Sequence, residues 1–339
     1  MLPLSVAIGR YDRTQALLDG RVKPSGLSIA VSTPPFEELF ARAFDRQEFD
    51  VAELSLSNFL AQTASGKCGY LALPIFPSRM FRHSAIYIRK DRAIRSPEDL
   101  IGRTIGVREY SNTATLTARG LLADEYGVDA HAIHWRYGVV HQGEPPPIVR
   151  RIPPGVDIAP IPATSNLSDM LAAGELDAVI SYKPPKCFLE SHPSVERLFS
   201  GHQDVEEAYF RKTGIFPIMH LIGVRKDVPG SAGPALCAAF EEAKKKALKD
   251  LEGYDALAVS LPWAPAEYAR TKAIFGGDPF PSGLKTNRRA LEASMRWSFE
   301  QGLLERKLEI GEIFSPASLD WEPSPAAHST SIKGPMRNV

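Results

Sequence analysis

Two arginines and a histidine stand close together between two apolar segments of this chain. Residues 77–84 read Pro-Ser-Arg-Met-Phe-Arg-His-Ser, and the flanking residues 71–76 and 85–88 have the composition of buried strands. A guanidinium group binds a carboxylate through two parallel hydrogen bonds, and an imidazole gives or takes a proton near neutral pH. The stretch therefore favours an anionic substrate and a proton transfer at one place. The alternative is a solvated loop with a capping histidine.

The composition excludes several classes of partner. Among 339 residues, 40 are basic and 40 acidic, which argues against a nucleic-acid-binding stripe or a polybasic membrane surface. Cys68, Cys187 and Cys237 lack the spacing of a zinc site or of a disulfide framework. No signal peptide is predicted, and no apolar run approaches the roughly 20 residues of a membrane span. We therefore expect a soluble protein of the reducing cytoplasm.

Predicted strands and helices alternate along the first third of the chain. The predicted strands cover residues 4–8, 27–31 and 50–54, and the predicted helices begin near residue 12 and cover residues 35–44 and 57–64. This alternation is typical of an α/β lobe. A second series begins with a strand over residues 102–107 and a helix from residue 111 to about residue 127.

The second series also contains the proline-rich residues 143–155, which we interpret as an irregular excursion. A helix over residues 167–173 and a strand over residues 174–180 follow. Tyr182 and Lys183 then stand at the carboxyl end of that strand, where open α/β sheets bind their ligands. The last predicted elements are a strand over 218–224 and helices over 232–251, 265–275 and 288–304.

The length of the chain favours two lobes of ordinary domain size. The order of the two series resembles the type 2 periplasmic-binding-protein fold, in which the chain crosses between two α/β lobes and returns, and the ligand lies in the cleft between them. The crossings would fall near residues 101–107 and 217–224. The predicted first lobe is therefore residues 1–101 with 218–321, the second is residues 102–217, and residues 322–339 are a disordered tail.

Several blocks of the sequence carry a closer resemblance. They are residues 9–14 (GRYDRT), 49–55 (FDVAELS), 76–84 (FPSRMFRHS), 214–220 (GIFPIMH) and 283–288 (GLKTNR). These blocks resemble the 4,5-dihydroxyphthalate decarboxylase family, and the Arg-Met-Phe-Arg-His sequence is the most specific of them. The resemblance implies a cytoplasmic carboxy-lyase that removes one carboxylate from an aromatic diacid and yields protocatechuate.

The implied reaction protonates the ring carbon that bears the leaving carboxylate, because a hydroxyl para to that carbon supplies electron density. It needs an acid at this carbon, a clamp for the second carboxylate and a partner for the phenolic proton. We expect neither a cofactor nor a metal. No metal-ligand spacing is found around the remaining histidines before the tail, His131, His134, His141, His192 and His202.

We expect Arg79 and Arg82 to hold the second carboxylate, with Arg13 at a helix start as a further anion contact. For Arg13 the alternative is an ordinary surface residue. For Arg82 it is a structural ion pair with Glu53 or with another carboxylate.

His83 and His220 are the two candidates for the acid, and each adjoins an apolar strand, where a core histidine is the alternative. Glu109 is the candidate acceptor of the phenolic proton, although it could equally be a helix N-terminal carboxylate. The further predicted contacts to the substrate are Ser55, Ser57, Thr113, Tyr182 and Lys183.

A non-catalytic solute-binding protein for an aromatic or small organic acid is the second functional hypothesis, because the same fold and clamp would serve it. The lack of a predicted signal peptide favours the enzyme. The thiamin-pyrimidine synthase relatives of the fold are similar only in general outline. In either case the expected partner is a small aromatic or organic carboxylate, and the apolar C-terminal helices could form a homo-oligomer interface.

Overall fold

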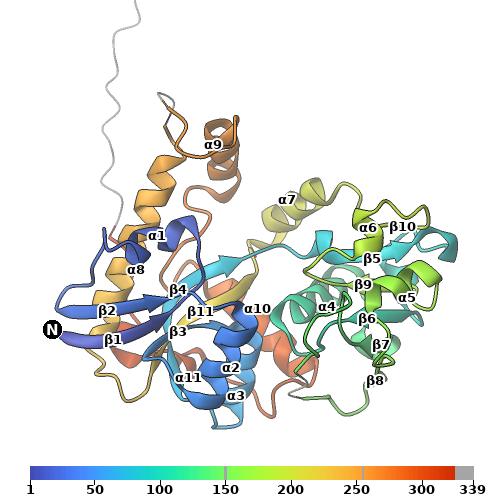
Figure 1. The fold of residues 1–339 in the computed structure, drawn as a ribbon, viewed down its shortest axis with the longest axis horizontal. Helices are drawn as coiled ribbons and strands as arrows, with labels where there is room; N and C mark the ends of the chain where they lie inside the picture. The colour runs from blue at the N-terminus through green and yellow to red at the C-terminus, as the bar shows by residue number, and fades with distance from the viewer. Residues whose placement is uncertain (149–150, 254–255, 325–339) are drawn as a thin grey trace, which may run out of the picture.

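The chain folds into two α/β lobes, each built on one β-sheet and lying side by side (Figure 1). The computed structural model describes residues 1–148, 151–253 and 256–324. The predicted disordered tail falls mainly on residues 325–339, which lie outside the described residues.

The first lobe contains the two ends of the described chain. Its elements are β1 (Leu2–Ala7), α1 (Asp12–Leu18), β2 (Leu27–Ser32), α2 (Phe36–Arg46), β3 (Val51–Ser55), α3 (Leu56–Ala64), β4 (Tyr70–Arg79), β11 (Ile218–Arg225), α8 (Ala232–Asp250), α9 (Ala264–Phe275), α10 (Arg288–Glu300) and α11 (Ile310–Ile313).

The second lobe is formed by the middle of the chain. Its elements are β5 (Ile86–Arg89), β6 (Thr104–Val107), α4 (Thr113–Tyr126), β7 (His134–Tyr137), β8 (Ile158–Pro160), α5 (Leu167–Ala173), β9 (Ala178–Ile180), α6 (Lys186–Leu189), β10 (Val195–Arg197) and α7 (His202–Thr213). Its sheet has the strand order β10-β5-β9-β6-β7-β8.

The first sheet has the order β2-β1-β3-β11-β4, and β11 runs antiparallel to both of its neighbours. The beginning of β11 therefore lies at the carboxyl ends of β3 and β4, the edge at which α/β sheets bind ligands. In this register His220 is paired with Ser55 of β3 and with Ser78 of β4. Residues far apart in the sequence thus meet at one edge.

Helices cover both faces of the first sheet and bury its apolar side chains. α1 and α8 contribute Leu17 and Leu236 to the core on one face, and α2, α3 and α10 contribute Leu39, Phe59 and Leu291 on the other. Burial of apolar area on both faces supplies the main stabilisation of such a layered lobe.

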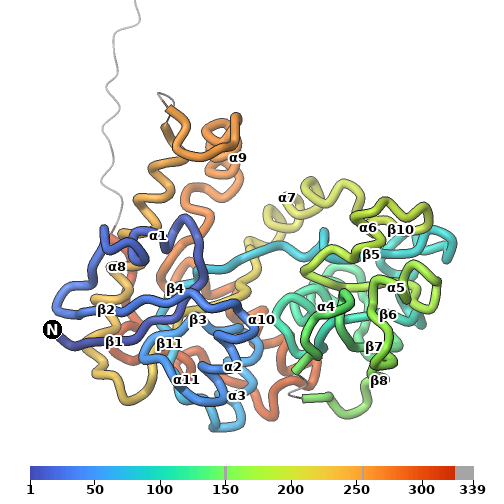
Figure 2. The backbone as a smooth tube through the Cα atoms, viewed as in Figure 1, coloured from blue at the N-terminus to red at the C-terminus, as the bar shows by residue number. Residues whose placement is uncertain are grey.

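The two crossings between the lobes lie next to each other (Figure 2). The chain leaves the first sheet after Arg79 and joins the second with β5, and it returns between α7 and β11. The backbone N–H of Met80 donates to the carbonyl of Pro217 at 3.1 Å, which ties one crossing to the other. The Arg-Met-Phe-Arg-His stretch is therefore itself the first crossing.

This position differs from the predicted first crossing near residues 101–107. The strand β5 was expected in the first lobe, but it pairs antiparallel with β9 in the second sheet. Its apolar composition suits either sheet, and only the partner strand decides to which sheet it belongs.

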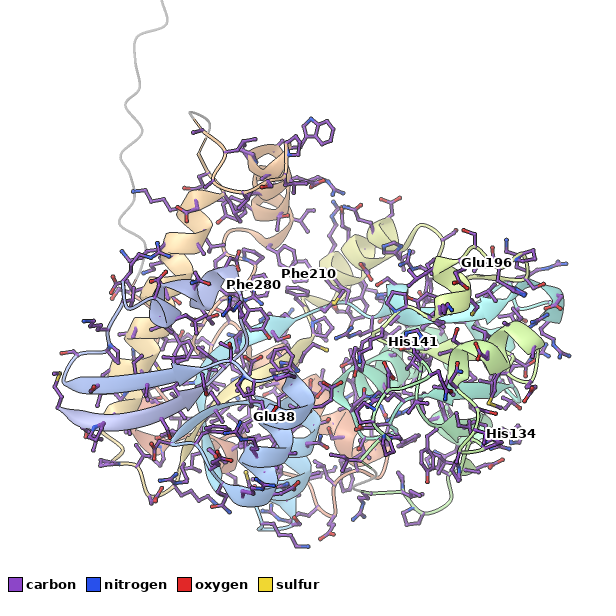
Figure 3. The ribbon with its side chains drawn as sticks, in the orientation of Figure 1. Glu38, His134, His141, Glu196, Phe210 and Phe280 are labelled. Carbon is purple, nitrogen blue, oxygen red and sulfur yellow. The ribbon has the colours of Figure 1, made fainter. Side chains whose placement is uncertain are left out.

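Further contacts hold the lobes together. Trp297 of α10 packs against Gly120 of α4, where a larger side chain would collide with the indole, and its Nε1 donates to Asp124 at 2.8 Å. On the opposite side the rings of Phe275 and Phe210 lie 4.4 Å apart between α9 and α7. Phe216 continues this aromatic cluster to Phe280 of the first lobe, with ring centroids 5.8 Å apart, and Figure 3 labels Phe210 and Phe280.

Cys68, Cys187 and Cys237 are all buried and unpaired. Within residues 1–148, 151–253 and 256–324, none of the helices has the length and apolar character needed to cross a bilayer.

Candidate active site

A cavity of about 570 Å³ lies between the lobes at the edge of the first sheet. This volume falls in the range of small-molecule sites and can hold one substituted aromatic ring. The predicted site residues on its wall are Ser55, Arg82, Glu109, Thr113, Tyr182, Lys183 and His220. The fold thus brings together side chains from both lobes and from the crossing segment.

His220 forms a hydrogen-bonded network with partners buried behind the wall. Its Nδ1 lies 2.6 Å from Oε1 of Glu53, its diagonal neighbour on β3, and the same oxygen accepts the Tyr11 hydroxyl at 2.6 Å. The other Glu53 oxygen accepts the backbone N–H of Gly9 at 2.8 Å. Because the fully buried Glu53 accepts these three bonds, Nδ1 of His220 is the protonated donor, and Nε2 is left to the cavity.

The electrostatics of this network keep Tyr11 a hydrogen-bond donor and Glu53 an acceptor. Burial, and then the negative charge of Glu53, raise the pKa of Tyr11 well above its usual range. Tyr11 therefore remains a neutral donor to Glu53. The carboxylate can accordingly stabilise a positive charge on the imidazole of His220 at a separation of 2.6 Å.

Two phenylalanines of α2 hold the imidazole in place. The ring centroids of Phe36 and Phe40 each lie 5.0 Å from that of His220, one tilted and the other edge-on. Both phenylalanines also line the cavity. The rings restrict rotation of the imidazole and offer an apolar surface to a planar ligand.

Arg82 places a nearly buried guanidinium on the same wall. Its Nε donates to the sulfur of Met219 at 3.2 Å, and an Nη donates to the sulfur of Met80 at 3.6 Å. In the part of the chain that the structure describes, no carboxylate forms an ion pair with Arg82; Glu53, the alternative partner, binds His220 and Tyr11 instead. Burial lowers the pKa of Arg82 to about 10, so it remains charged at neutral pH.

Thioethers are weak acceptors, so most of the hydrogen-bonding capacity of Arg82 is unused. Met219, its nearest partner, is the residue next to His220 on β11. Arg82 and His220 nevertheless line the same cavity, so one ligand can contact both.

Hydroxyl groups connect the ends of β3 and α4 at the cavity. Ser55 and Thr113 line it and share a hydrogen bond of 3.0 Å between their hydroxyl oxygens. The side chain of Asn112 accepts the backbone N–H of Thr115 at 2.7 Å and so fixes the start of α4. Ser57 stands one layer behind the wall, where its hydroxyl donates to the carbonyl of Ser111 at 2.6 Å.

Two predicted cations lie away from the cavity wall. Arg79 is buried and donates to the carbonyl of Phe216 at 3.0 Å and to the side chain of Asn287. Arg13 donates to the carbonyl of Pro77 at 2.6 Å, and its guanidinium stacks over the rings of Tyr11 and Phe280. Both arginines order the segments around the cavity.

Replacement of Arg79 should distinguish a structural role of this residue from a role in binding the substrate. We expect Arg79→Met to lower the free energy of unfolding by about 2 kcal/mol, because two acceptors lose their charged donor. The Michaelis constant for the substrate should change by less than about twofold, since Arg79 does not line the cavity. Thermal unfolding and steady-state kinetics measure the two effects, and a large rise in the Michaelis constant would instead make Arg79 part of the clamp.

His83 is placed in the interior of the second lobe rather than on the cavity wall. Its side chain is 1% exposed between the rings of Phe199 and Tyr209, and neither ring nitrogen has a hydrogen-bond partner among the described residues. The nearest carboxylate oxygen, on Glu206, is 3.9 Å away. Burial, with a smaller contribution from His202, lowers the pKa of His83 to about 4.

This histidine makes the fold sensitive to acid. Above pH of about 6.5 it is neutral in both states, but below that value the unfolded chain takes up a proton that the folded protein excludes. Stability should therefore fall as the pH drops from about 6.5 to about 4, by about 3 kcal/mol in total. In urea unfolding experiments, the free energy of unfolding should fall less on acidification in His83→Leu than in wild type. The exposed His131, replaced in the same way, is the matched control, and an equal acid response of both variants would contradict the prediction.

The most important neighbours of His220 were not predicted as site residues. Glu53 was considered only as a partner of Arg82, and Tyr11 was not considered. One signal was available, because a glutamate within a short apolar strand is costly to bury without partners. Phe36 and Phe40 carried no such signal, since their spacing on a helix is also that of core residues.

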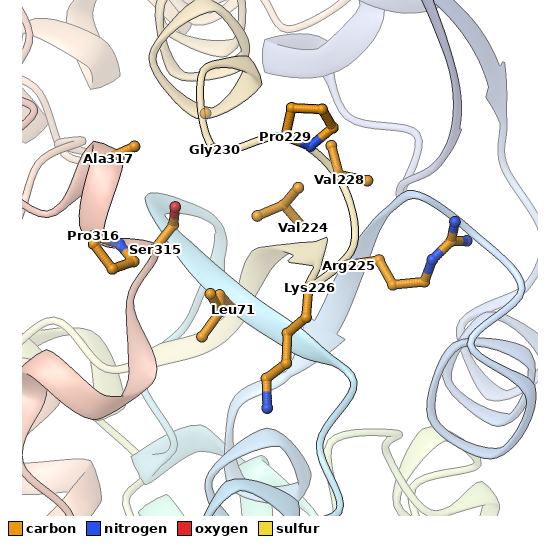
Figure 4. A pocket seen from close by; sticks show the side chains of 11 residues that line it. Leu71, Val224, Arg225, Lys226, Val228, Pro229, Gly230, Ser315, Pro316 and Ala317 are labelled. Carbon is orange, nitrogen blue, oxygen red and sulfur yellow. The ribbon is translucent and has the colours of Figure 1, made fainter.

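A second cavity of about 250 Å³ lies near the other end of β11 (Figure 4). Its wall is mostly apolar, with Leu71, Val224 and Pro229 among the lining residues, and it includes none of the predicted site residues. Its arginine, Arg225, is paired with Asp50 at 2.7 Å and with Asp227 at 2.6 Å. The interlobe cavity is therefore the candidate active site.

No cluster of three or more histidine, cysteine or acidic side chains suited to a metal ion occurs among the described residues. The side chains of the interlobe cavity instead offer an imidazole held by a carboxylate, a guanidinium and hydroxyl groups. These groups can bind an organic anion and transfer a proton to it.

Comparison with solved structures identifies the fold. The periplasmic aliphatic sulphonate binding protein SsuA of Escherichia coli superimposes with a TM-score of 0.54 at 13% identity, over 93% of this chain and 98% of that protein. The CA3427 gene product of Candida albicans, described as having the generic periplasmic binding protein fold, gives 0.50 at 12% identity over 96% and 99%. The predicted periplasmic-binding-protein-like fold is confirmed.

Comparison of sequences identifies the family, although no family model matches the chain. The 4,5-dihydroxyphthalate decarboxylase of Comamonas testosteroni is 39% identical over 324 residues, which cover 94% of this chain and 98% of that protein. The protein of the same name from Pseudomonas putida is 43% identical over 211 residues, or 62% of this chain and 82% of that one. In agreement with the resemblance seen in its sequence, the chain belongs to the 4,5-dihydroxyphthalate decarboxylase family.

Proposed function

We propose that this protein is a carboxy-lyase that converts 4,5-dihydroxyphthalate into protocatechuate and carbon dioxide. One observation carries the proposal: a single cavity contains an imidazole backed by a buried carboxylate and a guanidinium that pairs with no carboxylate among the described residues. The names of the two relatives in the family support the choice of substrate.

In this proposal Arg82 binds the carboxylate that is retained, and His220 donates the proton. The two carboxylates of the substrate are on adjacent ring carbons, so binding of one next to Met219 brings the carbon of the other towards His220. Glu53 and Tyr11 are positioning residues, because they act on the substrate only through the imidazole. Phe36 and Phe40 provide the apolar surface beside the leaving carboxylate.

In the chemical step the protein supplies a proton to the ring carbon, and Glu109 on the cavity wall accepts the hydrogen bond of the para hydroxyl as electron density leaves its oxygen. His220 enters the step as the imidazolium, with Nδ1–H bonded to Glu53 and a second proton on Nε2. Nε2 transfers its proton to the ring carbon that bears the leaving carboxylate, and a ring electron pair, supplied by the para hydroxyl oxygen, forms the new C–H bond. The C–C bond to the carboxylate then breaks, its electron pair returns to the ring and restores aromaticity, and carbon dioxide leaves. The proton transfer leaves His220 neutral, and a proton from solvent then restores the imidazolium, whose positive charge Glu53 stabilises.

The direct test is incubation of the purified protein with 4,5-dihydroxyphthalate. We expect release of carbon dioxide and formation of protocatechuate, and in D₂O one deuterium at the vacated ring position, detectable by NMR. Binding without turnover across a panel of hydroxylated aromatic diacids would reject the decarboxylase and favour a solute-binding protein.

We further propose that the enzyme works in the reducing cytoplasm. The three buried, unpaired cysteines, Cys68, Cys187 and Cys237, support this location. Fractionation of the native host, with the protein detected by antibody, would test it.

A further inference from the structure

The wall of the cavity contributed by the second lobe contains two cations that share one carboxylate. An Nη of Arg108 donates to Oε2 of Glu144 at 2.8 Å, and Nζ of Lys183 lies 3.1 Å from Oε1 of the same residue. A second Nη of Arg108 donates to the carbonyl of Pro145 at 3.0 Å. Arg108 and Lys183 line the cavity, whereas Glu144 lies behind them.

The charges on this wall are already compensated, in contrast to that of Arg82. Glu144 neutralises part of the cation pair, and Glu37 of α2 approaches Lys183 from the first lobe at 3.5 Å. Burial alone would raise the pKa of Glu144, but Lys183, a backbone N–H and Arg108 outweigh it and hold that pKa below its ordinary value. Glu144 therefore stays charged at neutral pH.

A compensated wall is suited to neutral hydroxyl groups rather than to a further anion. Lys183 and Arg108 keep N–H donors beyond those used in their ion pairs, and Glu109 on the same wall has carboxylate oxygens that accept. A hydroxyl group both donates and accepts a hydrogen bond, so it matches such a mixture. A carboxylate would have to compete with Glu144 for the same cations.

The proline-rich excursion provides the surface beside this wall. Pro145, Pro146 and Ile148 line the cavity next to Arg108, and the side chain of Tyr182 adds an aromatic edge. Glu144 fixes this segment by accepting the backbone N–H of Val140 at 3.1 Å as well as the two cations. The cavity wall therefore combines these polar groups with apolar side chains.

We infer that the wall formed by Arg108, Lys183 and Glu109 is the subsite for the ring hydroxyls of the substrate, and that Lys183 determines the preference for a hydroxylated ring. The inference rests on the proposed function and adds to it the orientation of the substrate. The carboxylates face Arg82 and His220, and the hydroxyls face the second lobe. Glu144 is a positioning residue that compensates the two cations.

The test compares the binding of protocatechuate (3,4-dihydroxybenzoate) and of benzoate to the full-length protein by calorimetry. Each ligand has one carboxylate, and they differ in the two hydroxyls. Wild type should bind the dihydroxylated acid about 10-fold or more tightly than benzoate, because hydrogen bonds to charged groups are strong. Lys183→Met should remove most of this ratio while benzoate affinity stays within about twofold. Lys186→Met, on the neighbouring α6 and paired with Glu190 outside the cavity, should leave the ratio unchanged.

A second variant tests the role of Glu144. Glu144→Gln leaves the cations uncompensated, so affinity for the tricarboxylate trimellitate should rise about 10-fold relative to wild type while the preference for hydroxyls falls. If Lys183→Met lowered the affinity for both ligands equally, or lowered neither, the ratio would stay unchanged and the inference would be overturned. These binding ratios do not depend on turnover, so failure of the decarboxylation assay would reject the proposed function alone.

Discussion

Replacement of His220 by asparagine should reduce turnover of 4,5-dihydroxyphthalate by about 100-fold or more, the usual contribution of a positioned general acid. Asparagine can retain the hydrogen bond that Nδ1 makes to Glu53, but it has no atom equivalent to Nε2 that can release a proton. The fold and the buried network should survive. The loss should therefore appear in the turnover number, with the Michaelis constant little changed.

An isotope experiment distinguishes loss of the acid from a general disturbance of the site. Wild type in D₂O should slowly exchange the ring hydrogen of protocatechuate at the vacated position, because protonation of that carbon is reversible. His220→Asn should lose this exchange in proportion to its loss of turnover. His83→Leu is the matched control, and it should keep both activities because His83 does not line the cavity. Full activity of His220→Asn would assign the proton to another group.

Replacement of Arg82 by methionine should lower kcat/KM by about 100-fold, since truncating one partner of a buried charged contact costs about 2–5 kcal/mol. Methionine preserves the apolar packing against Met80 and Met219 and removes only the charged donors. The effect should fall mainly on the Michaelis constant. Arg82→Lys should recover part of it, because lysine restores the charge but not the planar pair of donors.

Product inhibition separates Arg82 from His220. Protocatechuate keeps the carboxylate that we assign to Arg82, so its inhibition constant should rise in Arg82→Met by about the same factor as the Michaelis constant. In His220→Asn the inhibition constant should stay near that of wild type. If the product inhibited Arg82→Met as strongly as wild type, the retained carboxylate would have to bind elsewhere.

Local patterns in the sequence predicted most helices and strands closely. The helix expected over residues 232–251 is Ala232–Asp250, and the one expected over 265–275 is Ala264–Phe275. These segments have apolar residues at helical spacing and clear ends, so neighbouring residues alone determine their structure. The alternation of such segments predicted the α/β class, and the length of the chain with its resemblance to the periplasmic-binding-protein fold predicted the two lobes.

Which strands pair with each other was much harder to predict from the sequence. His220 and Glu53 stand 167 positions apart, and they meet only because β11 is inserted antiparallel between β3 and β4. The same limit explains β5, whose apolar residues fit either sheet. It also explains why His83 and His220 looked equivalent in the sequence, since each adjoins an apolar strand and only the fold shows which one reaches a cavity.

The adjacency of the two crossings has a consequence for the energetics of binding. The segment with Arg82 is hydrogen-bonded to the returning chain, and Trp297 and Phe275 join the lobes on either side of it. A receptor that signals by closing must order its lobes when the ligand arrives, and part of the binding free energy is consumed in doing so. Here the guanidinium and the imidazole are set relative to each other during folding. A larger part of the binding free energy of the substrate is then available to stabilise the transition state.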